Sequence, residues 1–128
     1  MYPENLRYTK DHEWIKIEGN MGTVGITDYA QHELGDIVYV GLPKKGEHFE
    51  AHGIFASVES VKAVSDVYCP AAGTVMEVNE ALVNAPERIN ADPHGEGWLI
   101  KLELDKPAAG QDLLTAPEYE EYIKGTGE

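Results

Sequence analysis

Short apolar runs, separated by turns rich in glycine, proline and asparagine, are the feature that most constrains how this chain can fold. The runs are too short for typical helices and several are rich in β-branched residues, so they are expected to form strands. The turns recur about every 8–12 residues, a spacing typical of β-sandwiches and β-barrels. The expected strands cover residues 14–18, 23–26, 36–40, 54–58, 63–68, 74–78 and 98–104. We therefore expect a mainly β fold.

Helical signals are few and short. Thr27 is suited to cap a helix over residues 28–34, because its hydroxyl can accept a hydrogen bond from the first turn. Gly35 is suited to end that helix. Residues 79–83 are expected to form a helical turn. Residues 84–97 are rich in Pro, Gly, Asn and Asp and are expected to form a loop.

The C-terminal part of the chain changes character. A helical segment is expected over about residues 108–124, with helices at 111–114 and 117–124. The tail, 125–128, is expected to fray. No stretch is long and polar enough to act as a linker, so residues 1–128 are expected to form a single domain.

The charge balance excludes some classes of partner. The chain has 23 acidic and 10 basic residues, which gives a formal net charge of −13. Binding to nucleic acid or to an anionic membrane depends on basic residues, so neither is expected. An acidic surface suits docking onto proteins that carry basic patches.

The cysteine content and the N-terminal residues bear on the compartment. Cys69 is the only cysteine, so neither an internal disulfide nor a cysteine-rich zinc site can form, and a reducing compartment is expected. No apolar run approaches the roughly 20 residues that span a bilayer. Residues 1–10 lack the features of a signal or transit peptide. We expect a cytoplasmic bacterial protein, or a mitochondrial one if a transit peptide has been trimmed.

The two central apolar runs flank the tetrapeptide Glu59-Ser60-Val61-Lys62, which predicts a hairpin with a tight polar tip. A lysine at such a tip protrudes and can enter the active site of another protein. Its amine can be acylated, which removes the charge and lengthens its reach. Position alone favours the simpler interpretation, because most lysines in hairpin turns are only solvated charges.

The sequence of the chain as a whole favours the interpretation that this lysine is modified. The sequence resembles the glycine cleavage H-protein family, in the order of that family's motifs and over nearly the full length. The Glu-Ser-Val-Lys-Ala block at 59–63 is moderately specific by itself, and the blocks together are highly specific. The matching stretches are 8–14, 24–31, 34–38, 58–63, 65–68, 73–79, 90–93 and 95–99.

The resemblance implies a barrel-sandwich hybrid fold, like that of lipoyl domains, with short helices at the termini. It implies lipoate in amide linkage on Lys62, on a lipoyl hairpin of about residues 54–69. The implied partners are a glycine decarboxylase with pyridoxal phosphate, an aminomethyltransferase with tetrahydrofolate, a dihydrolipoyl dehydrogenase with FAD, and a lipoylating enzyme. The carrier itself is expected to be non-catalytic and monomeric.

The resemblance also implies roles for several polar residues. Glu59 and Ser60 help the lipoylating enzyme to recognise the tip in the family, although they could equally satisfy backbone donors of the turn. Glu13 and Asp66 match acids that line a cleft for the loaded arm in the family. Asp11, two positions before Glu13 in the same motif, is a further candidate. The alternative for all three is a solvated acid on a strongly acidic surface.

Three other functions stay open at this point. The chain could be an H-like shuttle for lipoate relay or for another lipoyl-dependent complex. It could be a small enzyme that uses the carboxylates Glu13 and Asp66, or Cys69, although no nucleophile and base are paired in the sequence. It could also be an interaction module that is never lipoylated. His48 and His52 have a metal-ligand spacing only on a helix, and the surrounding Pro and Gly residues predict loop and strand, so no metal site is expected.

Overall fold

The computed structural model describes residues 2–106 and 113–126, and within them nine strands and four helices are present. The strands are β1 (Arg7–Tyr8), β2 (Glu13–Glu18), β3 (Met21–Ile26), β4 (Ile37–Gly41), β5 (His48–Phe49), β6 (Ile54–Ser60), β7 (Val64–Tyr68), β8 (Gly73–Val78) and β9 (Ile100–Leu104). The helices are α1 (Asp28–Leu34), α2 (Ala81–Asn84), α3 (Arg88–Ala91) and α4 (Ala116–Thr126). The predicted mainly β architecture is confirmed, and short helices occur inside the chain as well as near its C-terminal end.

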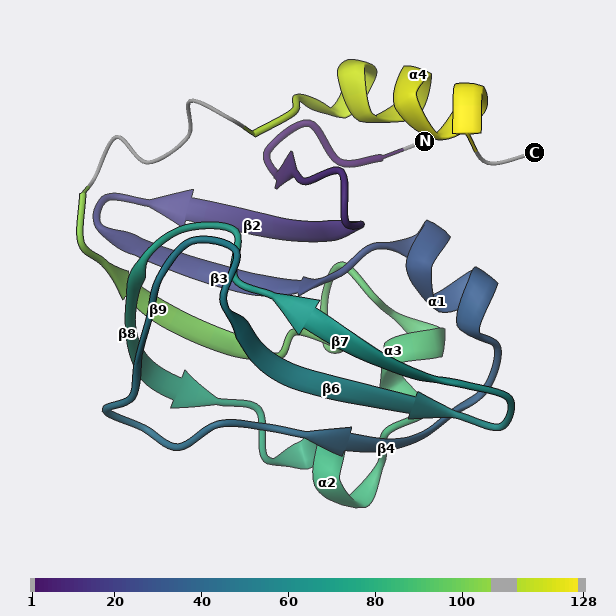
Figure 1. Cartoon of the computed structure of the whole chain (residues 1–128), viewed down its shortest axis with the longest axis horizontal. Coiled ribbons are helices and arrows are strands. Elements are labelled where there is room, and N and C mark those ends of the chain that lie inside the picture. Colours follow the sequence, from purple (N-terminus) through teal and green to yellow (C-terminus); the bar gives the residue numbers. More distant parts are fainter. Residues whose placement is uncertain (1, 107–112, 127–128) are drawn as a thin grey trace.

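The strands form two antiparallel sheets that share one apolar core (Figure 1). The larger sheet has the order β1-β2-β3-β9-β8-β5, and the smaller has the order β4-β6-β7. Side chains from both sheets meet in this core, so strands of both sheets must carry apolar residues on their inner faces. Its buried members include Val24, Ile26, Val40, Phe55, Val58, Val67, Ile100 and Leu102.

All seven predicted strands are present, with small shifts at their ends. β9 begins at Ile100, two residues later than predicted. Two further strands, β1 and β5, were not predicted, because each has only two residues and forms through pairing with a distant segment. Tyr8 of β1 pairs with Trp14 of β2, and Phe49 of β5 pairs with Gly73 of β8.

Helix α1 begins and ends as the sequence predicts. Thr27 has an extended backbone, and its hydroxyl accepts a hydrogen bond from the amide of Ala30 at 3.2 Å. Gly35 ends the helix with φ of 85°, a conformation that favours glycine. The predicted loop over 84–97 is wrong in part, because α3 lies within it. Ile89 is completely buried there, and its burial holds one helical turn in place.

The prediction for the C-terminal segment needs correction. Leu113 and Leu114 are not helical, since Leu114 exchanges two backbone hydrogen bonds with Tyr8, at 2.9 and 2.7 Å. The helix is α4, which starts at Ala116 and continues into residues 125–126, where fraying was expected. Residues 107–112 and 127–128, which complete the predicted segment and tail, lie outside the described part of the chain.

A second apolar cluster ties α4 and the N-terminal segment to the outside of the larger sheet, at the top of Figure 1. Tyr119 of α4 stacks on Tyr8 with 4.9 Å between ring centroids, and Trp14 is buried beside them. None of the helices in the described ranges has the length and apolar character needed to cross a membrane.

Candidate functional site

The tip of the β6–β7 hairpin is a four-residue turn closed by Ser60. The amide of Ser60 donates to the carbonyl of Ala63 at 2.8 Å. The Ser60 hydroxyl accepts hydrogen bonds from the amides of Lys62 (3.2 Å) and Ala63 (3.1 Å). The turn therefore spans Ser60 to Ala63, one residue later than predicted, and Glu59 belongs to β6. Ser60 is buried, and its side chain bonds within the turn.

Lys62 stands at the exposed end of this turn, and the segment after α1 supports the turn from one side. The amide of Val61 donates to the carbonyl of Asp36 at 3.1 Å. The Lys62 side chain passes close to Gly35, where a Cβ atom would lie 3.8 Å from Lys62 Cε. Within the described residues no carboxylate forms an ion pair with the Lys62 amine, which leaves it open to reagents.

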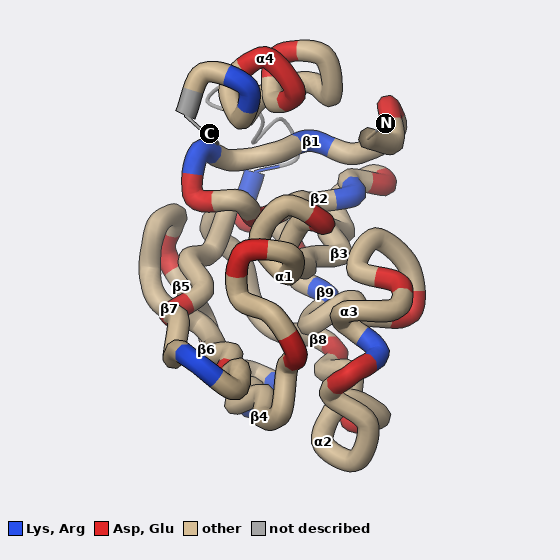
Figure 2. Tube along the Cα trace, turned by 90° about the vertical axis from the view of Figure 1, so that its right-hand side faces the viewer, with Lys and Arg blue, Asp and Glu red and all other residues tan. Residues whose placement is uncertain are grey.

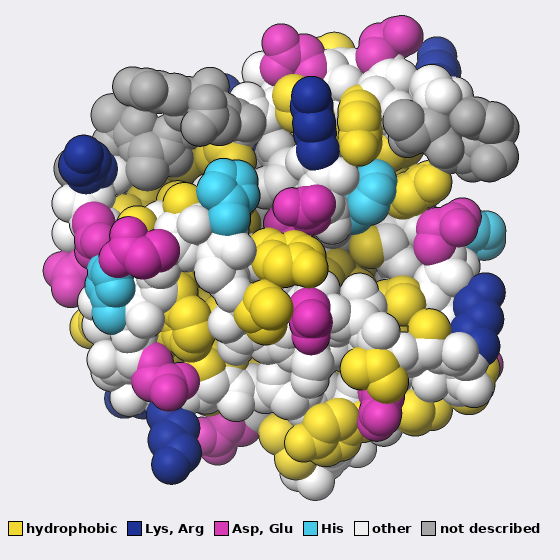
Figure 3. All heavy atoms as spheres, viewed as in Figure 1, with side chains coloured by type: hydrophobic (Ala, Val, Ile, Leu, Met, Phe, Trp, Pro, Cys, Tyr) yellow, Lys and Arg dark blue, Asp and Glu magenta, His cyan; other side chains and the backbone are white. Residues whose placement is uncertain are grey.

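Exposed apolar side chains surround the tip. Glu59 is exposed on β6 between Tyr39 of β4 and Val64 of β7, its cross-strand neighbours. Tyr39, Val64 and Val61 keep 56%, 66% and 70% of their surface exposed. Figure 3 shows hydrophobic side chains at the surface over β4 and β6, while Figure 2 shows acidic positions spread over the helices and both sheets. The tip is thus a lysine and a glutamate set in an apolar surface.

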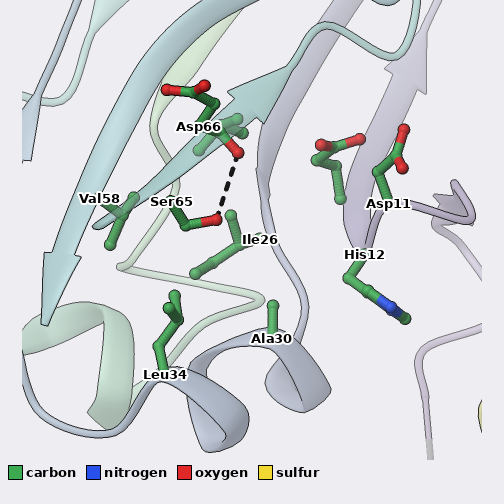
Figure 4. A pocket seen from close by; sticks show the side chains of 10 residues that line it. Asp11, His12, Ile26, Ala30, Leu34, Val58, Ser65 and Asp66 are labelled. Carbon is green, nitrogen blue, oxygen red and sulfur yellow. Dashed lines mark hydrogen bonds between the residues drawn. The ribbon is translucent and has the colours of Figure 1, made fainter. Parts of the chain in front are cut away.

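A hollow lies between α1, the start of β2 and the hairpin (Figure 4). It contains all three acids that the sequence suggested for an arm cleft, although they come from distant parts of the chain. Asp11 and Asp66 lie on different sides of it, with Ala30 and Leu34 of α1 along the bottom of the view. The backbone carbonyl of Asp66 accepts a hydrogen bond from the Ser65 hydroxyl, and the Asp66 carboxylate points away from α1. The lining residues are Asp11, His12, Glu13, Ile26, Ala30, Leu34, Val58, Ser65, Asp66 and Val67.

The three acids differ in environment. Asp11 and Asp66 are exposed, whereas Glu13 keeps only 2% of its surface exposed. Glu13 Oε1 accepts a hydrogen bond from the Thr9 hydroxyl at 2.6 Å, and Oε2 accepts one from the amide of Tyr68 at 2.9 Å. Glu13 therefore links β2 to β7, across the two sheets. Burial raises the pKa of its carboxyl to about 7, although both hydrogen bonds favour the ionised form.

His12 also lines the hollow, and sequence reasoning missed it. Its backbone has φ of 70°, and its Nδ1 is hydrogen-bonded to the hydroxyl of Tyr119 at 2.8 Å. Burial lowers the pKa of the His12 ring, so the neutral form prevails near pH 7. The contact joins residues 107 positions apart. Only its place beside Glu13 in the family-like motif could have indicated it.

The remaining candidates lie elsewhere. Cys69 is buried, and burial raises the pKa of its thiol to about 11, so the thiol is a poor nucleophile at neutral pH. His48 pairs with Asp105 at 2.7 Å on the surface. No group of three His, Cys, Asp or Glu side chains in the described ranges is placed to hold a metal ion.

Comparison with known proteins gives the family. A family model described as Glycine cleavage H-protein matches residues 6–126. The chain belongs to the glycine cleavage H-protein family. The glycine cleavage system H protein of Acidobacterium capsulatum is 58% identical over 123 residues, 96% of this chain and 95% of that one. That of Symbiobacterium thermophilum is 54% identical over 122 residues, 95% of each chain.

A solved structure of the family agrees with the fold described above. The crystal structure of a glycine cleavage system H protein from Mycobacterium marinum has a TM-score of 0.86 and 41% identity. The match covers 99% of this chain and 100% of the other. This likeness confirms the predicted barrel-sandwich hybrid fold.

Proposed function

We propose that this protein is the lipoyl-carrying H-protein of the glycine cleavage system, with lipoate in amide linkage on Lys62. The observation that carries the proposal is the placement of Lys62, at the exposed end of a turn closed by Ser60, in a chain of this family. The amine protrudes and is unpaired among the described residues, as an amine that is to be acylated must be. The β6–β7 strands give the arm a fixed base.

The carrier moves one arm between several active sites. Glycine decarboxylase, with pyridoxal phosphate, loads an aminomethyl group onto the lipoyl disulfide. The aminomethyltransferase passes the one-carbon unit to tetrahydrofolate and releases ammonia, and dihydrolipoyl dehydrogenase, with FAD, reoxidises the dithiol. This protein supplies the arm and its resting place and catalyses none of these steps. We place it in the bacterial cytoplasm as a monomer, in keeping with its bacterial relatives and its buried free thiol.

The lipoylating enzyme has the strictest geometric demand of these partners. It forms the amide bond on Lys62 Nζ, so its active site must cover the hairpin tip itself. We propose that Glu59 and the apolar residues beside it, Tyr39 and Val64, form the surface that this enzyme contacts. Ser60 contributes through the turn that it closes, because its side chain is buried.

The hollow beside α1 is proposed to receive the end of the loaded arm. Its apolar side chains, such as Leu34 and Val58, suit the hydrocarbon part of the arm. Asp11 and Asp66 are the exposed carboxylates that can pair with the cationic amine of the aminomethyl group. Glu13 contributes mainly by holding β2 against β7, since both of its oxygens already accept hydrogen bonds.

The mass of the protein made in its native host tests the main proposal. Intact-mass measurement should reveal a lipoyl-sized increment, and peptide mapping should place it on the peptide that contains Lys62. The host should be grown with glycine in the medium, to induce glycine breakdown, because the modification is expected under that condition. An unmodified Lys62 in cells whose other lipoyl proteins are modified would overturn the proposal.

Replacing Asp66 by asparagine is expected to weaken the protection of the loaded arm. The carboxylate charge that is proposed to pair with the arm's amine is lost, while the shape of the side chain is kept. An exposed ion pair contributes about 0.2–1 kcal/mol, so release of ammonia from the isolated loaded protein should quicken by up to roughly fivefold. Glu103→Gln, an exposed acid on β9, is the matched control and should leave the rate unchanged. Equal rates for both variants would remove Asp66 from the arm's resting place.

A further inference from the structure

Helix α1 forms a wall of the hollow, yet apolar burial does little to hold it. It has only seven residues, and none of them is fully buried. A helix of this length is unstable by itself in water, because nucleation is costly and few hydrogen bonds follow it. Ala30 and Leu34 lie only half-buried against the core. Polar contacts at the ends of α1 must therefore hold it in place.

Asn90 of α3 binds the C-terminal end of α1 through three hydrogen bonds. Its Nδ2 donates to Gln31 Oε1 at 2.8 Å and to the carbonyl of Gly35 at 3.0 Å. Its Oδ1 accepts from the amide of Ile37 at 2.9 Å. One side chain thus satisfies groups on both sides of Asp36, where the chain turns from α1 into β4.

His94 binds the other end of α1. Its Nε2 accepts a hydrogen bond from the amide of Asp28 at 3.1 Å, next to the cap made by Thr27. The His94 ring is itself held among aromatic side chains, with its centroid 5.4 Å from Tyr2 and 6.3 Å from Trp14. Residues 90–94 therefore hold both ends of α1, a role that the sequence alone did not predict.

The contacts of Asn90 continue to the hairpin tip. Gly35 and Ile37, which Asn90 holds, enclose Asp36, whose carbonyl accepts the amide of Val61 at 3.1 Å. Gly35 also lies close to the Lys62 side chain. In Figure 1 the segment after α1 descends beside the hairpin tip on the right-hand side. A shift of residues 35–37 would therefore change the direction in which Lys62 leaves the turn.

We propose that Asn90 is a positioning residue, which holds residues 35–37 so that Lys62 directs its arm along α1 and into the hollow. His94 assists by holding the far end of the same helix. The part of this inference that concerns the arm rests on the proposed lipoylation of Lys62. The part that concerns the tip does not, because the contacts are those of the unmodified chain.

Amide hydrogen exchange of the full-length, unlipoylated protein tests the second part. In Asn90→Ala the amide of Val61 should exchange roughly five- to tenfold faster, after correction for the variant's loss of global stability. This factor corresponds to the loss of about one hydrogen bond. Asn79→Ala is the matched control: Asn79 is buried and, like Asn90, donates two side-chain hydrogen bonds, but its acceptors are the carbonyls of Glu96 and Trp98 and not residues 35–37. Asn90→Asp, which keeps the acceptor for Ile37, serves if the alanine variant does not fold.

Reduction of the lipoyl disulfide by a small phosphine tests the first part without any partner enzyme. In lipoylated protein, Asn90→Ala should make reduction several-fold faster, because an arm that is no longer directed into the hollow is more accessible. Asn79→Ala should react at the wild-type rate. Equal changes in the two variants, in exchange or in reduction, would overturn the assignment of Asn90. A protein without a lipoyl mass increment would instead refute the proposed function, while the exchange result would still stand.

Discussion

Replacing Lys62 by arginine is expected to abolish lipoylation and carrier activity completely while leaving the fold intact. Arginine keeps the positive charge and most of the length of the side chain, and Lys62 makes no ion pair with a described residue that the change could break. The guanidinium stays protonated near neutral pH and is a very poor nucleophile toward an activated acyl group. The purified variant should therefore have no lipoyl mass increment, and glycine cleavage with the partner enzymes should fall to the rate without carrier.

A second lysine variant tests whether the effect is specific to position 62. Lys45 also lies in an exposed turn, between β4 and β5, so Lys45→Arg should be lipoylated and active like the wild type. If Lys62→Arg still acquires a lipoyl group, another lysine is the attachment point. If the wild type is lipoylated but does not support glycine cleavage with partners from its own host, a carrier for lipoate relay becomes the better assignment.

The sequence predicts the hairpin and its lysine well because both depend on local patterns. Two apolar runs around a short polar segment leave few alternatives to a hairpin, and the end of the turn follows within one residue. The support of the tip could not be predicted in this way. It depends on Asn90, which lies 53 positions from Ile37 in the sequence and reaches it only through the fold. The strands β1 and β5 were missed for the same reason, since two residues carry no periodicity.

The acids of the hollow illustrate a different limit. Glu13, Asp11 and Asp66 looked alike in the sequence, and the structure brings all three to one hollow. Burial then separates them, because Glu13 is held inside by Thr9 and Tyr68 while the other two are exposed. Composition and spacing contain no signal for that difference. It arises from the packing of β2 against β7, which is a property of the whole fold.

The buried Glu13 is expected to make the stability of this protein fall as the pH rises. Its carboxyl has a pKa of about 7 in the folded state, against an ordinary value of 4.5. Between these values the folded state binds more protons than the unfolded state, so the free energy of unfolding decreases with increasing pH. The contribution is fully present below about pH 4.5 and is lost as the pH rises through 7, and the difference amounts to about 3 kcal/mol.

Glu13→Gln isolates this contribution from those of the other acids. The amide stays neutral, so the variant lacks this part of the pH dependence. At pH 5 the variant should be less stable by about 1–3 kcal/mol. The side-chain NH2 group of the glutamine would face either the backbone amide of Tyr68, which is also a donor, or the Thr9 hydroxyl, which already accepts a hydrogen bond. Urea unfolding at pH 5, 6, 7 and 8 should show the gap closing as the wild type loses stability. Glu77→Gln, on the exposed side of β8, should show no such trend.

A gap that stays constant from pH 5 to 8 would mean that the pKa of Glu13 is not raised, because its two hydrogen bonds offset the effect of burial. The loaded arm provides a further comparison, because binding and ionisation are linked. A cationic amine in the hollow favours the ionised form of Glu13 and so lowers the pKa of its carboxyl. The loaded protein should therefore lose less stability between pH 5 and 8 than the unloaded one. The same comparison in Glu13→Gln should show a smaller difference, since the carboxyl whose pKa lies in this range has been removed.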